Sequence, residues 1–434
     1  MGASVPAAIL SMAIPAKVDA AEDWNAKAQS TIVWQFKPAF NSPYEGAHTL
    51  SGAREDSYSF TATAALGLRI GASTELYFDP EAAQGDPLSG LTGLAGFTNG
   101  EMARTSGANL SVYRARLFVR HVIALGDESK EVDSAMNQLA GQYPLRRVTL
   151  TAGNLSVLDL FDANQYNHDP RTQFLNWTVM THGAYNFAAD ARGYTWGLAA
   201  EYQDDGWALR VGRFIQPREP NQLSLDRRIL RHYGDQVELE RRFDAGEGRP
   251  GVLRMLVFRN RAVMARYDDA LALAESTGSP PSLAPVRTTE HTKVGAGVNL
   301  EQTLSRDVGS FLRAMWADGK TETYAFTEAD RSISAGTSIM GTSWKRPADY
   351  LGVAFAINVL SRPHRQFLER GGTTFFLGDG RLNYAPEQIV EIYYSFAPLR
   401  QLALSLDYQR IAHPGYNADR GPASFFALRL HLEN

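Results

Sequence analysis

Cysteine is absent from this chain of 434 residues, and so is any long run of apolar residues. The lack of cysteine excludes disulfides and thiolate metal sites. No stretch reaches the roughly 18 consecutive apolar residues that a membrane-spanning helix needs, and the mean hydropathy is −0.27. If the chain crosses a membrane, it must therefore do so as a closed β-barrel, the other architecture that satisfies every backbone N–H and C=O group in lipid.

A large charge of one sign is also absent. The net charge of −4 argues against nucleic acid as a partner. The HExxH, GxSxG and Walker A motifs are missing, so we expect no metal, no cofactor and no enzymatic activity. An outer-membrane phospholipase is the enzyme alternative, but no histidine stands at a suitable offset from Ser395 or Ser405 on a neighbouring predicted strand.

Segments in which apolar and polar residues alternate recur along the chain. Clear examples are 113–120, 402–409 and 426–433. Alternation with a period of two predicts strands with one apolar and one polar face. The polar face carries many full charges, and aromatic residues make up 11% of the chain. Both features favour a membrane barrel, with a watery lumen and aromatic girdles, over a soluble sandwich.

The alternation predicts an all-β fold: a closed antiparallel transmembrane β-barrel of about 16 strands. The strands are expected near 28–36, 58–69, 73–80, 109–124, 146–154, 193–203, 206–215, 234–243, 250–260, 291–301, 308–319, 332–343, 349–359, 386–396, 401–411 and 422–432. Short joints alternate with long ones, as periplasmic turns and extracellular loops do in such barrels. The segment 125–145 is longer than a turn should be, and residues 131–139 are expected to form a short periplasmic helix there.

The chain is expected to have two parts. Residues 1–20 are predicted to be a secretory leader, because an apolar core over 7–14 precedes small residues typical of a cleavage site at 18–20. Residues 21–434 are predicted to form a single outer-membrane β-barrel domain, with the loop 155–192 folded into the pore.

Several short motifs follow one another along the chain. QSTIVWQ occupies 29–35 and ELYFDPE occupies 75–81. DLFDAN at 159–164 leads into HDPRTQFLNW at 168–177 and DARGYTW at 190–196, and LGDG at 377–380 and PGYN at 414–417 come later. In this order the motifs resemble the carbohydrate-selective porin family, the OprB family, over nearly the whole chain after the leader.

The resemblance implies a monomeric barrel of sixteen strands in the outer membrane of a Gram-negative bacterium. Such a barrel lies in outer-membrane lipid, is inserted by the barrel-assembly machinery and passes carbohydrate solutes, namely glucose and related sugars. A trimer is the alternative, since many porins of this strand count are trimers. The chain departs from the family at Asn434, where an aromatic residue is usual.

A sugar that enters a narrow pore loses part of its hydration, so groups that line the pore must replace those hydrogen bonds. Arginines and carboxylates suit this role because charge-assisted hydrogen bonds are strong. Strand parity predicts that Arg114, Arg116 and Arg120 form an arginine ladder on one wall of the lumen. The same parity adds the lumen candidates Arg69, Glu75, Glu201, Arg210, Glu238, Glu240, Arg254, Arg313, Glu391, Asp407, Gln409 and Arg429. The alternative is that these are solvated faces whose charges pair with each other.

The long segment 155–192 supplies a second set of candidates. Phe161 and Trp177 are placed to stack on a sugar ring, and Asp162, Arg171 and Asn176 are placed to hydrogen-bond it. In the alternative interpretation, the acids Asp159, Asp162 and Asp169 cap turns and tether the loop to the arginine wall. The sequence leaves these two readings level.

The preferred function is passive or facilitated diffusion of mono- and oligosaccharides through a charged lumen. The first alternative is a general or anion-preferring porin for small polar solutes, because an arginine ladder alone would suit anions. A barrel for polysaccharide export is a further alternative, and it would need a wider lumen and an inner-membrane partner.

Overall fold

The computed structural model describes residues 21–102 and 107–434. The predicted leader over 1–20 lies outside these residues.

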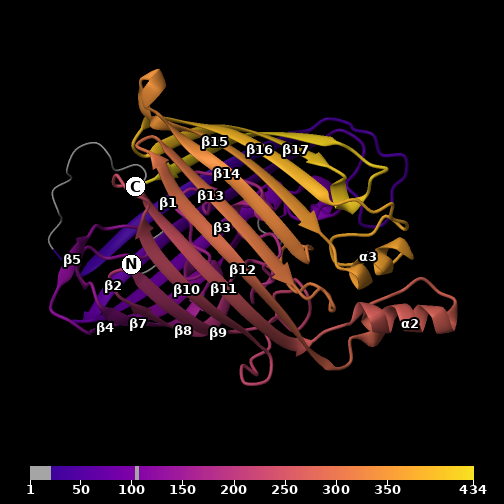
Figure 1. Cartoon of the computed structure of the whole chain (residues 1–434), viewed down its shortest axis with the longest axis horizontal. Helices are drawn as coiled ribbons and strands as arrows, with labels where there is room; N and C mark the ends of the chain where they lie inside the picture. The colour runs from indigo at the N-terminus through magenta and orange to yellow at the C-terminus, as the bar shows by residue number, and fades with distance from the viewer. Residues whose placement is uncertain (1–20, 103–106) are drawn as a thin grey trace.

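Sixteen strands of the described residues form one closed antiparallel barrel, in which β1 pairs with β18 (Figure 1). The barrel strands are β1 (Trp24–Lys37), β2 (Glu55–Gly71), β3 (Thr74–Asp86), β4 (Ser111–Ala124), β7 (Arg147–Leu155), β8 (Thr195–Gln203), β9 (Trp207–Ile215), β10 (Tyr233–Asp244), β11 (Pro250–Val263), β12 (Glu290–Ser305), β13 (Val308–Ala317), β14 (Arg331–Gly341), β15 (Arg346–Val359), β16 (Glu387–Leu399), β17 (Leu402–Ala412) and β18 (Ala423–Glu433). Consecutive barrel strands are neighbours, and the first and last strands close the sheet without a free edge.

Short turns join the strands at one end of the barrel and long segments join them at the other. We call these the short-turn end, which includes 204–206, 245–249 and 400–401, and the long-loop end. Three α-helices occur among the described residues: α1 (Trp177–Met180), α2 (Tyr267–Thr277) and α3 (Arg362–Glu369). Figure 1 places α2 and α3 beyond the long-loop end, away from β5 (Ser129–Val132). None of the helices within residues 21–102 and 107–434 is long and apolar enough to cross a membrane.

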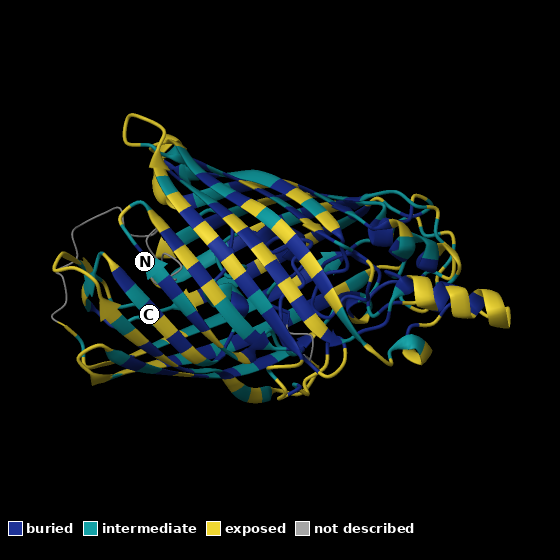
Figure 2. Ribbon diagram, turned by 60° about the horizontal axis from the view of Figure 1, so that its bottom comes forward, coloured by how far each residue is buried: buried dark blue, intermediate teal, exposed yellow. Residues whose placement is uncertain are grey.

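Exposure alternates along the barrel strands. On β10, Glu238 and Glu240 are buried, whereas the intervening Val237 and Leu239 are exposed. Figure 2 shows the same chequered pattern of buried and exposed residues across the neighbouring strands. Because the sheet is closed, buried strand residues point into the barrel and exposed apolar residues point outward, where lipid would cover them. The predicted barrel and its alternation are confirmed.

Each of the sixteen predicted ranges overlaps one strand of the barrel. The helix predicted over 131–139 is wrong. The segment forms a small two-stranded sheet of β5 (Ser129–Val132) and β6 (Gly141–Pro144), and Leu139 is buried against the barrel. Pairing and burial of this kind outweigh local helix propensity.

The core of the molecule lies inside the barrel. Segments from the long-loop end contribute Phe97, Trp177, Phe187 and Phe326 to one large cluster of buried apolar residues. The lumen is therefore largely filled by protein, and any route for a solute must pass between these segments and the strand wall.

Candidate functional site

A cavity of about 710 Å³ lies inside the barrel. Its lining includes Lys27, Arg400 and Asn434, so it reaches the short-turn end. At its other side it is lined by Trp177 and Phe326 from the filled part of the lumen. Strand β4 and the segment 165–194 supply many of the polar groups between these limits.

Arg116 projects into this cavity from β4. Its guanidinium donates two hydrogen bonds to the Asp159 carboxylate, at 2.8 and 2.7 Å, and a third to Asp79 at 3.3 Å. Asp159 also closes the first turn of the following segment, because it accepts a hydrogen bond from the backbone N–H of Ser156. Arg116 therefore fixes the start of segment 155–192 against the wall.

Arg120 lies further along β4 than Arg116, nearer the short-turn end. Its guanidinium donates to the Asn137 carbonyl at 3.0 Å and lies 3.8 Å from the Glu75 carboxylate. Glu75 in turn accepts hydrogen bonds from Tyr77 and Tyr143, both at 2.7 Å. The segment between β4 and β7 is thus tied back onto the wall beside the cavity.

Arg171 crosses the cavity from the segment that fills the lumen. It lies 3.0 Å from the Glu101 carboxylate and 3.7 Å from that of Glu81. Tyr113 and Tyr194 donate hydrogen bonds to the same Glu81 carboxylate, at 2.5 and 3.3 Å. Burial opposes its charge, but Glu101 and other nearby acids outweigh this and raise the pKa of Arg171 above its ordinary value. The side chain remains cationic.

An aromatic stack forms the inner wall of the cavity. The rings of Trp177 and Phe326 are parallel to within 3°, with centroids 4.9 Å apart, and Phe187 stacks on Phe326 at 5.0 Å. Phe97 meets Trp177 edge-on at 6.4 Å. Trp177 keeps 8% of its surface exposed, on the side that lines the cavity.

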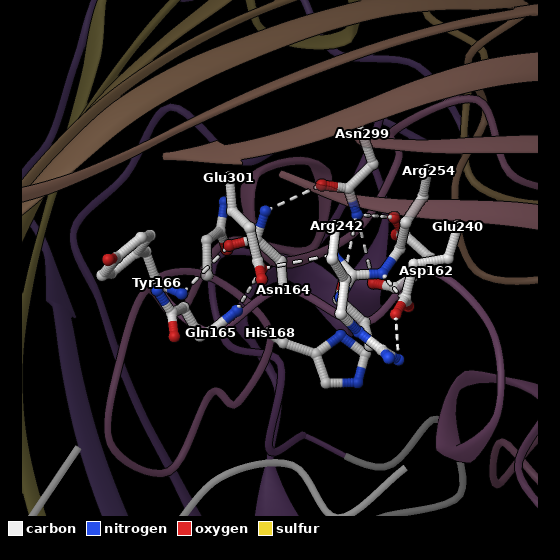
Figure 3. A network of polar contacts seen from close by, with 12 residues as sticks. Asp162, Asn164, Gln165, Tyr166, His168, Glu240, Arg242, Arg254, Asn299 and Glu301 are labelled. Atoms are coloured by element: carbon white, nitrogen blue, oxygen red, sulfur yellow. Dashed lines mark hydrogen bonds and ion pairs between the residues drawn. The ribbon is translucent and has the colours of Figure 1, made fainter. Parts of the chain in front are cut away.

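Asp162 ties the same segment to β12 and β13, on the far wall. Its carboxylate accepts hydrogen bonds from Asn299 at 2.6 Å, from Arg313 at 2.9 Å and from Thr181 at 2.7 Å. Figure 3 shows Asp162 and Asn299 in one network with Asn164 and Glu301. Burial raises the pKa of the Asp162 carboxyl, but Arg313 and then His182 outweigh it and hold that pKa well below its usual range.

A second anchor holds the segment to β16, β17 and β18. Glu391 accepts hydrogen bonds from the backbone N–H groups of Leu175 and Asn176. The Asn176 side chain donates to Gln409 at 3.0 Å, and Arg429 donates to the Pro170 carbonyl at 2.6 Å. Side chains of strands on opposite walls of the barrel therefore bind segment 155–192 from both sides.

A buried ladder of opposite charges follows β8 to β12. Arg210 donates to Glu201, Glu238 and Glu240, at 2.5, 2.9 and 2.9 Å. Arg254 continues the ladder by donating to Glu240 at 3.0 Å and pairing with Glu301 at 3.2 Å. Each charge is compensated by a neighbour, and Glu238 also accepts the backbone N–H of Asp162.

Most of the predicted residues fall into two groups. Of the candidates, Arg116, Arg120, Arg171 and Trp177 line the cavity. The others that point inward take part in the ladder or in the anchors, or pair near the short-turn end, as Arg69 does with Glu75 at 3.2 Å. This second group comprises Arg69, Glu75, Glu201, Arg210, Glu238, Glu240, Arg254, Arg313, Glu391, Asp407, Gln409 and Arg429.

The prediction that Arg114 faces the lumen is wrong. Arg114 is exposed, and its guanidinium lies 5.0 Å from the ring of Trp196 on the outer surface. The pairing of β3 with β4 shifts between Asp79 and Pro80, which pair with Arg116 and Arg114. Proline lacks the N–H that a regular ladder needs, and a bulge there reverses the parity of β4 beyond it.

Three loop candidates do not reach the cavity. Phe161 is fully buried with its ring edge-on to Phe214 at 6.1 Å, so the prediction that it stacks on a sugar is wrong. Asp162 and Asn176 are also fully buried, and their polar groups are engaged by the anchors. The geometry of Asp159, Asp162 and Asp169 fits the alternative, in which loop acids cap turns and tether the segment.

The cavity-lining residues that sequence reasoning missed include Glu81, Glu101, Tyr113, Tyr194 and Phe326. Regular parity carried through the bulge places Tyr113 on the lipid face, and Pro80 inside a predicted strand is the signal against that. Glu101 and Phe326 lie outside the barrel strands, where parity gives no direction, and Tyr194 lies just before β8 although the predicted strand 193–203 includes it. Among residues 21–102 and 107–434, no group of three or more His, Asp or Glu is placed to hold a metal ion.

Comparison with known proteins gives a consistent picture. A comparison with curated protein sequences finds no significant match. Among solved structures, OprB of Pseudomonas putida at high pH is similar over 95% of this chain and 94% of that protein, with a TM-score of 0.72 and 14% identity. The outer-membrane channel DcaP of Acinetobacter baumannii is similar over 95% and 97%, with a TM-score of 0.52 and 9% identity. OccAB1 of the same organism has a TM-score of 0.50 at 9% identity, over 95% and 97%.

These likenesses show a shared barrel fold, and the sequence itself carries the assignment further. Residues 49–433 match the family described as carbohydrate-selective porin, OprB family. The match spans almost all of the barrel, from the first long segment to the end of β18. It also includes the cavity-lining residues of β4 and of segment 155–192. The chain therefore belongs to the OprB family of carbohydrate-selective porins.

Proposed function

We propose that this porin lets neutral sugars diffuse across an outer membrane, with the 710 Å³ cavity as the narrow part of their path. The observation that carries the proposal is the lining of that cavity. It combines the paired charges Arg171–Glu101 and Arg116–Asp159 with the exposed side of the Trp177–Phe326 stack. The short-turn end would face the periplasm and the long-loop end the exterior, as in other outer-membrane barrels.

This lining matches the chemistry of a sugar. Each hydroxyl that leaves bulk water needs a replacement hydrogen bond, since an unpaired polar group costs about 1–3 kcal/mol. Guanidinium and carboxylate groups supply both donors and acceptors, and their hydrogen bonds are charge-assisted. The aromatic wall offers an apolar surface to the C–H face of a sugar ring. Because the lining charges already pair with each other, a passing solute is bound weakly enough to leave.

The balance of charge favours a neutral solute over an anion. The cations that line the cavity are Lys27, Arg116, Arg120, Arg171, Arg192 and Arg400. The carboxylates are Glu81, Glu101, Asp159, Asp169 and Glu433. The arginine ladder that suggested an anion-preferring porin also loses a member, since Arg114 points outward. Whether monosaccharides alone or also oligosaccharides pass depends on the space that Trp177 and Arg171 leave for a larger solute.

Single-channel recording in a planar bilayer tests the proposal. Glucose, maltose and a neutral polyether of similar size are titrated against the ion current. We expect concentration-dependent block by the sugars and none by the polyether. Arg171→Gln and Trp177→Ala should each weaken the block. The first removes a charged hydrogen-bonding group from the lining, and the second removes part of its aromatic wall. Arg410→Gln is the matched control, since this arginine is exposed on the outer face of β17. Open channels that no sugar blocks would overturn the proposal.

A further inference from the structure

The outward faces of β9, β10 and β11 change from apolar to arginine-rich in one step. In register across these strands, Leu209, Leu239 and Met255 form one exposed apolar row, and Val211, Val237 and Val257 form the next. The following row toward the long-loop end is Arg213, Asp235 and Arg259. The register therefore places these charges directly beside the exposed apolar rows of the same three strands.

Tyr233 marks the same boundary. Its ring lies between two guanidinium groups, with Arg213 at 4.0 Å and Arg259 at 5.2 Å from the ring centroid. The ring is covered by these guanidinium groups, since only 7% of Tyr233 is exposed, so the arginines form the outer surface here. Arg213 donates to Asp235 through two nitrogens and Arg259 through one, so neither guanidinium has all of its five N–H donors occupied by this carboxylate.

Three further arginines extend this surface: Arg261 near the end of β11, and Arg228 and Arg231 in the segment between β9 and β10. Arg261 pairs with Glu290 at 2.8 Å, and Arg231 contacts the same carboxylate. Arg228 pairs with Asp226 at 2.6 Å, and His232 lies between Asp226 and Glu290, at 2.6 and 3.1 Å. We call Arg213, Arg228, Arg231, Arg259 and Arg261 the outer arginine patch.

The carboxylates of this surface are shared, so the patch keeps an excess of positive charge. Five arginines are served by only three acids, because Asp235 pairs with both Arg213 and Arg259 and Glu290 with both Arg231 and Arg261. The side chains remain open to the outside: 52% of Arg259 and 63% of Arg231 are exposed. An arginine has five N–H donors, and one shared carboxylate cannot occupy them all.

An exposed leucine stands beside these charges. Leu230, next to Arg231 in the segment between β9 and β10, is 84% exposed. An apolar side chain of this kind beside arginines suits a surface that meets both the acyl chains and the headgroups of a lipid.

We propose that the outer arginine patch binds the phosphate groups of a lipid headgroup in the outer leaflet. Its guanidinium groups offer paired N–H donors that match phosphate oxygens, and the patch lies where the apolar band ends. The proposal rests on the placement of the long-loop end outward in the membrane, and not on the passage of sugars.

Native mass spectrometry of the purified full-length barrel in detergent tests this. The barrel is titrated with bisphosphorylated lipid A, with the same lipid A after removal of both phosphates, and with inorganic phosphate as a competitor. We expect tight binding of the phosphorylated lipid alone. Arg259→Gln combined with Arg261→Gln should weaken it on the order of 10- to 30-fold, since each removes a cation at a charged membrane surface.

The double variant Arg331→Gln with Arg410→Gln removes two other outward-facing arginines and should leave the affinity unchanged. Single-channel conductance of both double variants should equal that of the unchanged protein, which shows that the barrel is folded. Equal binding of the dephosphorylated lipid, or equal loss in the two double variants, would overturn the proposal. Displacement of the lipid by millimolar inorganic phosphate would instead show a site for free phosphate, which also contradicts it.

Discussion

Asp162 shows how much of the lumen depends on one side chain. It is fully buried, and donors from three different parts of the chain converge on its carboxylate: Asn299, Arg313 and Thr181. The Arg313 side chain is equally buried and also donates to the Asn167 carbonyl. The pair thus holds segment 155–192 against β13, and the cavity keeps its shape only while the segment stays there.

Asp162→Asn is expected to destabilise this arrangement. The substitution keeps the size of the side chain but leaves Arg313 as an uncompensated buried charge, which costs about 3–5 kcal/mol. We expect a lower midpoint of thermal unfolding and frequent brief changes of single-channel current as the segment loosens. Asp244→Asn is the control, because Asp244 is exposed at the end of β10. An unchanged midpoint would show that Asp162 does not anchor the segment.

The pH dependence of this stabilisation has a definite sign. In the folded protein, burial opposes ionisation of Asp162, but Arg313 and His182 hold its pKa below the usual range. A carboxyl whose pKa is lowered on folding stabilises the fold fully above its unfolded pKa of about 3.9. That contribution is lost as the pH falls below about 4 toward the folded pKa. Asp162→Asn should therefore show a smaller loss of stability than the unchanged protein in that range.

Single residues also show where sequence reasoning ends. The inward direction of Arg116 and Arg120 follows from regular alternation, and the structure agrees. The prediction for Arg114 is wrong because the bulge opposite Pro80 reverses the parity between Arg114 and Arg116. Alternation reports only which of two faces a residue occupies, so one irregular pairing inverts every assignment beyond it.

Among the elements, the segment between β4 and β7 is the unusual one. It joins two strands at the short-turn end, yet it folds back to the mouth of the cavity, where Met136 and Asn137 line it. Asn137 donates to Asp79 at 2.9 Å, and the backbone N–H of Leu139 donates to Tyr77 at 3.2 Å. These contacts narrow the mouth from the short-turn side.

Replacing residues 127–144 with a two-residue Asn-Gly turn should widen that mouth. Such a turn joins antiparallel strands directly, and we expect a higher single-channel conductance with the barrel intact. Removing 275–280 is the matched control, because these residues are all exposed and lie at the end of α2 and just after it, beyond the long-loop end (Figure 1). Equal conductance of the shortened and the unchanged protein would show that the segment lies outside the ion path.

Elements differ in how much of them the sequence predicts. A barrel strand meets two environments, lipid and lumen, and its alternation records both, so all sixteen strands were predicted from the pattern. The segments that fill the lumen carry no such period. Their positions depend on contacts far apart in the chain, such as Leu175 with Glu391 or Arg171 with Glu101. The sequence therefore predicts that the anchoring residues on the strands point inward. It does not predict which groups of the lumen segments they bind.

On the scale of the whole molecule, the charged side chains inside the lumen pair with side chains of opposite charge. The ladder of Arg210 and Arg254 with its glutamates, the anchor of Arg313 on Asp162 and the pair Arg171–Glu101 all join opposite charges. A pore lined by charges of one sign concentrates ions of the other sign. A pore with balanced charges does not, and it leaves selection to hydrogen bonding and shape.

The zero-current potential across a bilayer with a salt gradient measures this balance. For the unchanged protein we expect a potential near zero, because cations and carboxylates that line the cavity are almost equal in number. Arg171→Gln should shift the potential toward cation preference, since Glu81 and Glu101 then lose their shared cation. Arg410→Gln, on the outer face, should leave it unchanged. A strong anion preference in the unchanged protein would instead favour the anion-preferring porin, because the arginines would then act on solutes without their carboxylate partners.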